Sequence, residues 1–207
     1  SVDVKTELCR APLSRKCCAQ AEAYGVLLYC NTFHAAQARI VTENGAFAQR
    51  LPLLFKKAFR LTFDSLPQGG GKQVFEVLEP DKMAALHKTF GTDPRAVALH
   101  VNFAMLEESC CRAAFLRGAF LAGGSVTDPR KGYHLELATS HHSVSREVLA
   151  LMRELDQEPK SAQRKGNAVI YFKQSEKIED FLTCIGAPIA AMEVMNAKLE
   201  RDLRGKV

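Results

Sequence analysis

An internal repeat limits the folds open to this chain. When the sequence is shifted by 93 positions, residues 17–28 fall over residues 110–121 and five pairs are identical: Cys17/Cys110, Cys18/Cys111, Ala21/Ala114, Gly25/Gly118 and Leu28/Leu121. Five matches over so short a stretch can arise by chance, so the order of the surrounding elements must also be compared. If that order repeats, the two halves share one architecture.

The first half predicts a mixed succession of helices and strands. Ser14 could cap a first helix that ends near Cys30, and apolar residues recur at helical spacing after residue 46. Gly91 is expected to end the last helix of this half as a C-cap. The expected elements are helices over 14–30, 46–59 and 80–91, and extended stretches over 32–38, 39–43 and 73–78.

The second half repeats this order within two residues. Ser109 could cap its first helix, and Gly186 ends its last helix as Gly91 does in the first half. The expected elements are helices over 109–123, 142–156 and 176–184, and strands over 125–127, 133–138, 161–165 and 168–173. Each half therefore predicts the order helix, strand, strand, helix, strand, strand, helix, which makes the fold α+β with a duplicated αββαββα unit.

The repeat also sets the predicted domain boundaries. The N-terminal half covers residues 1–105 and the C-terminal half covers residues 106–187. Pro188 then opens a helix, expected over 189–203, that has no counterpart in the first half and becomes increasingly charged. Residues 188–207 are therefore predicted to be a linker helix towards a further domain.

Composition excludes several classes of protein. The chain is 47% apolar and 25% charged, and no run approaches the roughly 18 apolar residues that span a bilayer. It opens on no secretory signal, and its seven cysteines, two adjacent pairs among them, are a poor disulfide framework. Both points favour a reducing cytoplasm. A net charge of +5 permits contact with nucleic acid without requiring it.

Residues 115–125, Phe-Leu-Arg-Gly-Ala-Phe-Leu-Ala-Gly-Gly-Ser, resemble the LAGLIDADG signature of homing endonucleases. Gly118 and Gly124 fall on its first and last glycines, and Gly25 falls on the first glycine in the other half. In that family two such helices pack at a pseudo-two-fold axis, and the strands form a saddle over double-stranded DNA. The resemblance implies that Gly25, Gly118 and Gly124 lie at the helix interface.

The acidic residues of that signature are missing. In the family, an acid at the foot of each helix holds Mg²⁺, because a hard cation prefers carboxylate oxygen. Here the two positions are Cys30 and Gly123. A thiol suits Mg²⁺ poorly and glycine offers no ligand. Asp128 lies beyond the second helix in a predicted turn, so we expect no catalytic residue, no cofactor and no enzyme.

A duplicated LAGLIDADG core without its acids is similar to the WhiA family of bacterial transcription regulators. Residues 112–126, Gly132-Tyr-His-Leu-Glu136 and residues 189–201 carry the resemblance, which extends over the whole chain. It implies a DNA-binding regulator of cell division, chromosome segregation and sporulation, associated with the nucleoid. In the family a helix-turn-helix domain, expected to be missing from this chain, supplies much of the DNA binding, and a regulatory protein is a further possible partner.

Basic side chains on the predicted sheets are the candidates for DNA contact. Charged side chains of this kind bind phosphates and fix orientation, whereas base recognition needs other groups. The candidates are Arg39, Lys72, Lys131, His134, Arg164 and Lys165. Two alternatives stay open: a platform that docks a protein partner or its own helix-turn-helix domain, and a divergent endonuclease that uses other acids.

Three further motifs are weaker. His134, His141 and His142 lack the spacing of a metal site, and Gly69-Gly70-Gly71-Lys72 leads into a strand rather than a helix, unlike a phosphate-binding loop. The paired cysteines of the repeat are expected to pack near the helix interface as small apolar groups, and no metal ion is predicted. A redox or metal role across the axis is the alternative interpretation for them.

Overall fold

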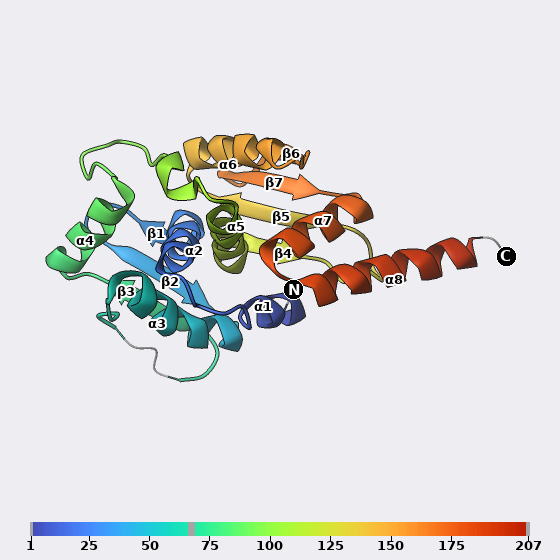
Figure 1. Cartoon of the computed structure of the whole chain (residues 1–207), viewed down its shortest axis with the longest axis horizontal. Coiled ribbons are helices and arrows are strands. Elements are labelled where there is room, and N and C mark those ends of the chain that lie inside the picture. The colour runs from blue at the N-terminus through green and yellow to red at the C-terminus, as the bar shows by residue number, and fades with distance from the viewer. Residues whose placement is uncertain (1, 66–68, 206–207) are drawn as a thin grey trace.

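The computed structural model describes residues 2–65 and 69–205 (Figure 1). Its first half contains α1 (Val2–Leu8), α2 (Lys16–Tyr29), β1 (Thr32–Phe33), β2 (Ala38–Thr42), α3 (Gly45–Phe59), β3 (Gln73–Val77) and α4 (Pro80–Phe90). A 3₁₀ turn, Phe103–Leu106, leads to α5 (Ser109–Gly123), β4 (Gly124–Val126), β5 (Leu135–Thr139), α6 (His142–Glu154), β6 (Lys160–Arg164), β7 (Asn167–Phe172) and α7 (Ser175–Ile185). The long helix α8 (Pro188–Arg204) follows.

Local chemistry sets several helix ends. Asn44 caps α3 by accepting a hydrogen bond from the backbone N–H of Phe47 at 2.9 Å. Gly91 and Gly186 adopt the left-handed conformation and end α4 and α7, as predicted. The predicted caps Ser14 and Ser109 are wrong, because α2 begins after Arg15 and Ser109 is itself the first residue of α5.

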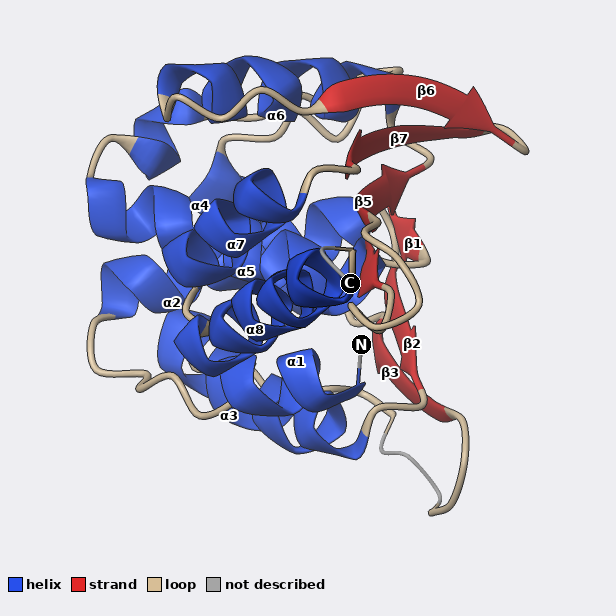
Figure 2. Cartoon of the chain, turned by 90° about the vertical axis from the view of Figure 1, so that its right-hand side faces the viewer, coloured by secondary structure: helices blue, strands red, loops and turns tan. Residues whose placement is uncertain are grey.

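The strands form two antiparallel sheets. Within the described residues, the first sheet has the order β1-β2-β3 and the second has the order β4-β5-β7-β6. Figure 2 shows the helices on one side of this layer of strands and no helix over the other side. The predicted fold class, α+β with two LAGLIDADG-like halves, is confirmed.

The first half departs from the predicted αββαββα order. The strand expected before β3 is reduced to an isolated bridge between Ser65 and Glu76, next to residues 66–68, which lie outside the described chain. Helix α1, which precedes the repeat, was not predicted. Its seven residues are too few to show a clear apolar period, so the sequence carries little signal for it.

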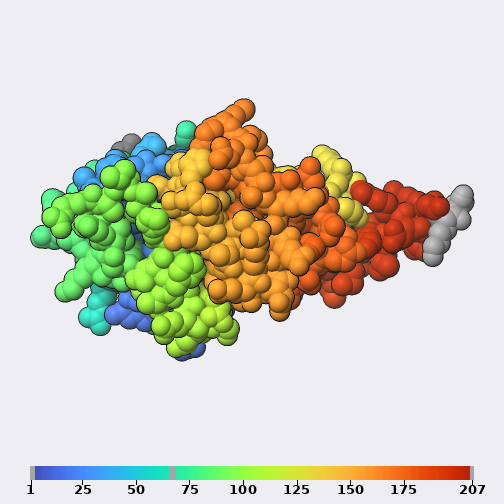
Figure 3. Space-filling view, turned by 90° about the horizontal axis from the view of Figure 1, so that it is seen from above, coloured from blue at the N-terminus to red at the C-terminus, as the bar shows by residue number. Residues whose placement is uncertain are grey.

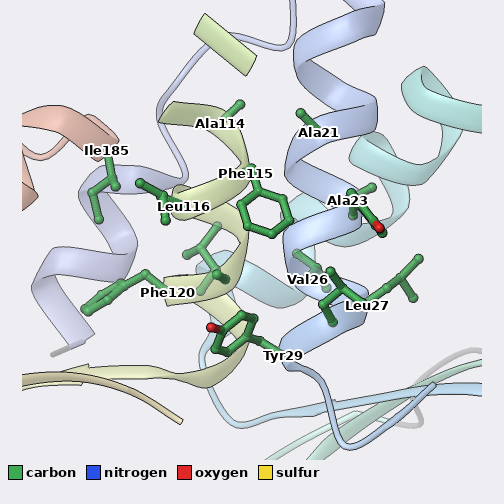
Figure 4. Packing of buried hydrophobic residues seen from close by; sticks show 14 of the residues in the cluster. Ala21, Ala23, Val26, Leu27, Tyr29, Ala114, Phe115, Leu116, Phe120 and Ile185 are labelled. Atoms are coloured by element: carbon green, nitrogen blue, oxygen red, sulfur yellow. The ribbon is translucent and has the colours of Figure 1, made fainter. Parts of the chain in front are cut away.

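Helices α2 and α5 pack against each other at the centre of the molecule. Both are buried around most of their circumference, which is typical of a helix inside a core. Figure 4 shows Ala21 facing Ala114 at one end of the pair, with Phe115 and Val26 between the helices further along. Each half therefore contributes one helix to a shared core, and the sheets lie at the end of the pair marked by Tyr29.

Helix α8 packs on α7 through its first turns and then leaves the body (Figures 1 and 3). Its buried residues are Ala190, Ala191 and Val194. Across residues 2–65 and 69–205, no helix has both the length and the apolarity needed to span a bilayer.

Candidate nucleic-acid interface

Two glycines allow the central helices to touch backbone to backbone. A Cβ at Gly25 would lie 2.1 Å from the carbonyl oxygen of Phe115, and a Cβ at Gly118 would lie 2.0 Å from the carbonyl oxygen of Glu22. No side chain larger than hydrogen fits such a gap. The near equality of the two distances reflects the pseudo-two-fold relation of the halves. This contact fixes how the two sheets are placed relative to each other.

The foot of α5 is closed by its neighbours. A Cβ at Gly123 would lie 2.6 Å from the carbonyl oxygen of Ala138 and 3.0 Å from Cδ2 of Tyr29. At Gly124, the first residue of β4, the three nearest atoms all belong to Phe120 of α5, whereas Gly123 contacts Tyr29 of α2; the interface position of Gly124 stays a prediction. Position 123 therefore has no room for a carboxylate that could reach towards a metal ion.

The foot of α2 carries a neutral thiol. Cys30 donates hydrogen bonds to the carbonyl oxygens of Leu27 at 3.2 Å and Thr32 at 3.3 Å. Burial raises the pKa of Cys30 to about 12, so the group is protonated at neutral pH. Neither Cys30 nor position 123 therefore offers a ligand suited to Mg²⁺.

The uncovered face of the sheets is defined by strand register. In β5 and β7, Leu135 pairs with Phe172 and both are buried towards the helices. Glu136 pairs with Tyr171, and Tyr171 with Lys160 of β6, so these three side chains share the other face. We call the corresponding side of both sheets the open face.

The open face of the second sheet has a carboxylate at its centre. Glu136 is only 7% exposed, and it accepts hydrogen bonds from Arg164 and His134, each at 2.9 Å to its Oε1. These partners, Arg164 first, lower the pKa of Glu136. Two of the six residues predicted to contact DNA are thus engaged with an internal acid.

The other four candidates are not joined into one cluster. Arg39 stands on the open face of the first sheet opposite Glu76. Lys72 precedes β3, Lys131 lies in the loop between β4 and β5, and Lys165 lies in the turn between β6 and β7; all three are exposed. The candidates are therefore spread along the open face and its rim, as phosphate contacts along a duplex would be.

Comparison with known proteins places this geometry in a family. The profile of the WhiA LAGLIDADG-like domain matches residues 112–204. A probable cell division protein WhiA from Ruminiclostridium cellulolyticum is 37% identical over 219 residues, which cover the whole chain and 70% of that protein. The chain belongs to the WhiA family. A second WhiA protein, from Alkaliphilus oremlandii, is 31% identical over the whole of this chain and 70% of that protein.

Solved structures support the same fold. Full-length DUF199/WhiA from Thermatoga maritima matches with a TM-score of 0.73 at 21% identity, over 97% of this chain and 66% of that one. The homing endonuclease I-DmoI, in complex with DNA and Mn, matches with a TM-score of 0.59 at 11% identity, over 83% of this chain and 98% of that one. At these identities the likeness concerns architecture alone.

Two basic residues on the open face of this WhiA-family chain were missed. Lys160 shares the face with Tyr171, and Lys173 lies 5.5 Å from the centre of the Tyr171 ring. All five residues of β6 are exposed. The strand therefore lacks the alternation of apolar and polar residues from which the sequence could have shown which side chains point to the open face. Tyr171 itself is half-buried on the open face.

The histidines and Asp128 do not assemble into a site. His134 bonds Glu136, whereas His142 lies 3.1 Å from the carbonyl oxygen of Gly166 on another loop, so the three histidines are not brought together. Asp128 binds the backbone N–H of Arg130 at 3.0 Å, which together with the Arg130 side chain lowers the pKa of Asp128. This turn-forming role accounts for the carboxylate without a metal ion.

Proposed function

We propose that this chain is a non-catalytic DNA-binding module of a WhiA-family regulator that acts in cell division, on the chromosome in the nucleoid. The observation that carries the proposal is the open face, which no helix covers and which bears basic side chains from both sheets and their loops. The name of the Ruminiclostridium relative supports the role in cell division. Roles in chromosome segregation and sporulation are proposed from family resemblance.

The contacts would be made mainly to phosphates. Exposed lysines can reach the phosphate backbone of DNA without being aligned to particular base pairs, and this set includes Lys72, Lys131, Lys160 and Lys165. Arg164, in contrast, is bound to Glu136. Modest affinity and little sequence preference are therefore expected of this module alone. A helix-turn-helix domain, implied by the family resemblance, would supply base recognition.

Salt dependence tests DNA binding directly. Fluorescence anisotropy with a short duplex should give a log Kd that rises linearly with log salt, and each Lys→Ala change on the open face should lower the slope by about 0.9. Lys160→Ala and Lys165→Ala are the test variants, and Lys88→Ala on α4 is the matched control. A flat slope, or equal effects of Lys88→Ala, would contradict the proposal.

The absence of catalysis is tested separately. Incubation of supercoiled plasmid with the protein and Mg²⁺ or Mn²⁺ should leave the plasmid intact. Cleavage that disappears in Asp128→Asn would support the divergent endonuclease instead, because Asp128 is the carboxylate that follows the α5 motif most closely.

A second candidate function rests on α8. Its exposed apolar side chains follow helical spacing and form a stripe: Ile189, Met192, Met195, Leu199 and Leu203. Such a stripe is suited to docking another protein surface. We propose that its occupant is the helix-turn-helix domain that the resemblance implies. Titration with that domain from a WhiA relative should show binding, and Met192→Lys with Met195→Lys should abolish it; unchanged binding would exclude the stripe.

A further inference from the structure

Four thiols meet at the N-terminal ends of the central helices, at the end of the pair remote from the sheets. Cys17 and Cys18 lie in the first turn of α2, and Cys110 and Cys111 lie in the first turn of α5. The helices run the same way and the repeat relates the pairs, so the pseudo-two-fold axis passes between them. We call these four residues the thiol cluster.

The sulfurs of the thiol cluster belong to two overlapping groups of three ligand atoms, which share Cys111. Those of Cys17, Cys18 and Cys111 lie within 4.8 Å of one another, and so do those of Cys110 and Cys111 together with a carboxylate oxygen of Glu108. The thiols also interact crosswise between the helices, Cys18 with Cys110 and Cys111 with Cys17. Neither half could build this arrangement alone.

The geometry points to a site for one soft metal ion of the zinc class, held by the thiol cluster across the two halves. A zinc–sulfur bond is about 2.3 Å, which sets tetrahedral sulfurs about 3.8 Å apart. Thiolates bind soft metal ions in preference to Mg²⁺ or Ca²⁺. The proposed site therefore differs in chemistry from a metal site whose ligands are carboxylate oxygens.

The surroundings suit a negatively charged metal–thiolate centre. Both helices direct the positive ends of their dipoles at the cluster, which stabilises thiolates. Arg15 adds a cation, with its guanidinium 3.2 Å from Cys110 Sγ and 3.1 Å from Glu108 Oε2. The carboxylate of Glu108 is a further oxygen ligand for the ion, and its Oε2 lies 3.4 Å from Cys110 Sγ.

Two thiols of the cluster, one from each helix, have shifted pKa values. Burial, reinforced by the neighbouring thiols, raises the pKa of Cys18 to about 11 and that of Cys111 to about 12. These two thiols are therefore neutral at physiological pH. A metal ion displaces their protons when it binds.

Spectroscopic titration tests the site. The protein is reduced, freed of metal with a chelator and titrated with Co²⁺, then with Zn²⁺. One equivalent of Co²⁺ should bring thiolate charge-transfer bands in the near ultraviolet and tetrahedral d–d bands, and one equivalent of Zn²⁺ should remove them. Zn²⁺ should also raise the Tm, since it binds the folded state.

Variants separate the thiol cluster from other cysteines. Cys18→Ser should weaken Zn²⁺ binding by at least about 100-fold. Cys17→Ser with Cys110→Ser, at two half-buried positions, should do the same and tests the site with less risk to the core. Cys184→Ser on α7 is the control and should bind as the unmodified chain does.

Three outcomes would overturn the proposal. One is the absence of charge-transfer bands, and another is bands that persist in Cys17→Ser/Cys110→Ser. The third is quantitative formation of a disulfide between the helices in the protein purified without reductant and under metal-saturating conditions, detected by mass spectrometry. The site does not depend on DNA binding, so failure of either proposal leaves the other intact.

Discussion

At the scale of single residues, the axis glycines are the least replaceable positions of the molecule. Gly25 and Gly118 each face a backbone carbonyl of the opposite helix rather than a side chain that could rotate away. An added methyl group therefore has to push the helices apart, and the sheets attached to them move as well.

We expect Gly118→Ala to lower the free energy of unfolding by about 3 kcal/mol, the upper end for overpacking. Gly45→Ala is the matched control, because a Cβ there meets nothing within 4 Å. Urea unfolding followed by far-ultraviolet circular dichroism measures both. Equal stability of the two variants would show that the helices are not packed as closely as described.

Glu136 is a second residue whose replacement is informative. It holds Arg164 and His134 on the open face, so Glu136→Gln should release a cation for phosphate contact and remove a repelling charge. DNA affinity should rise, and the slope of log Kd against log salt should steepen by about 1. The control is Glu158→Gln, whose carboxylate is exposed beside Lys177. Weaker binding by Glu136→Gln would mean that Glu136 positions the open face rather than masking it.

At the scale of elements, different kinds of contact hold the two ends of α8 against the rest of the molecule. Its first turns pack on α7 through small side chains. Near its end, the Arg201 guanidinium lies 4.8 Å from the centre of the Tyr133 ring and donates hydrogen bonds to the carbonyl oxygens of Pro129 and Arg130 at 3.4 and 3.3 Å. One side chain thus ties the outer part of the helix to the loop that carries Lys131.

Removal of this tie should loosen only the outer part of α8. In Arg201→Ala, amide hydrogens of residues 198–204 should exchange at least about fivefold faster, since a cation–π contact contributes about 1 kcal/mol, while residues 189–194 stay protected. Arg204→Ala is the control, one turn further on. Hydrogen exchange with mass spectrometry measures both, and uniform protection along α8 in Arg201→Ala would contradict this account.

Most elements of the fold could be predicted from the sequence because strong local signals mark their ends. Gly91 and Gly186 end helices through a left-handed conformation that other residues avoid. The caps at Ser14 and Ser109 were predicted wrongly because a serine near a helix start is a weak signal that tertiary packing can override. The pairing of Glu136 with Arg164 could not be predicted, because it depends on the order of β5, β7 and β6 in the sheet.

At the scale of the whole molecule, a buried ionic network joins the two halves. Glu22 of α2 is 1% exposed and binds Arg50 of α3 at 2.7 and 2.9 Å. Its other contact is Arg117 of α5 at 3.1 Å, and Arg117 also donates to the carbonyl oxygen of Ile185 at the end of α7. One carboxylate therefore connects helices from both repeats.

Loss of that charge should destabilise both halves together. Glu22→Gln leaves the buried guanidinium of Arg50 and the half-buried one of Arg117 without their anion, which should cost about 3–5 kcal/mol. The sequence has no tryptophan, so tyrosine fluorescence and circular dichroism are the probes. Their transitions should coincide in urea for both the variant and the unmodified chain. Two separate transitions would show that the halves fold as independent units.

The closed position at Gly123 has an evolutionary consequence. A glycine can become an aspartate by a single base change, but here the new side chain would strike the carbonyl oxygen of Ala138 before it could serve any purpose. A lineage with this contact would have to move β5 as well as replace the glycine. An acid at this position therefore requires a coordinated change in the strand beside it, and the base change alone cannot supply one.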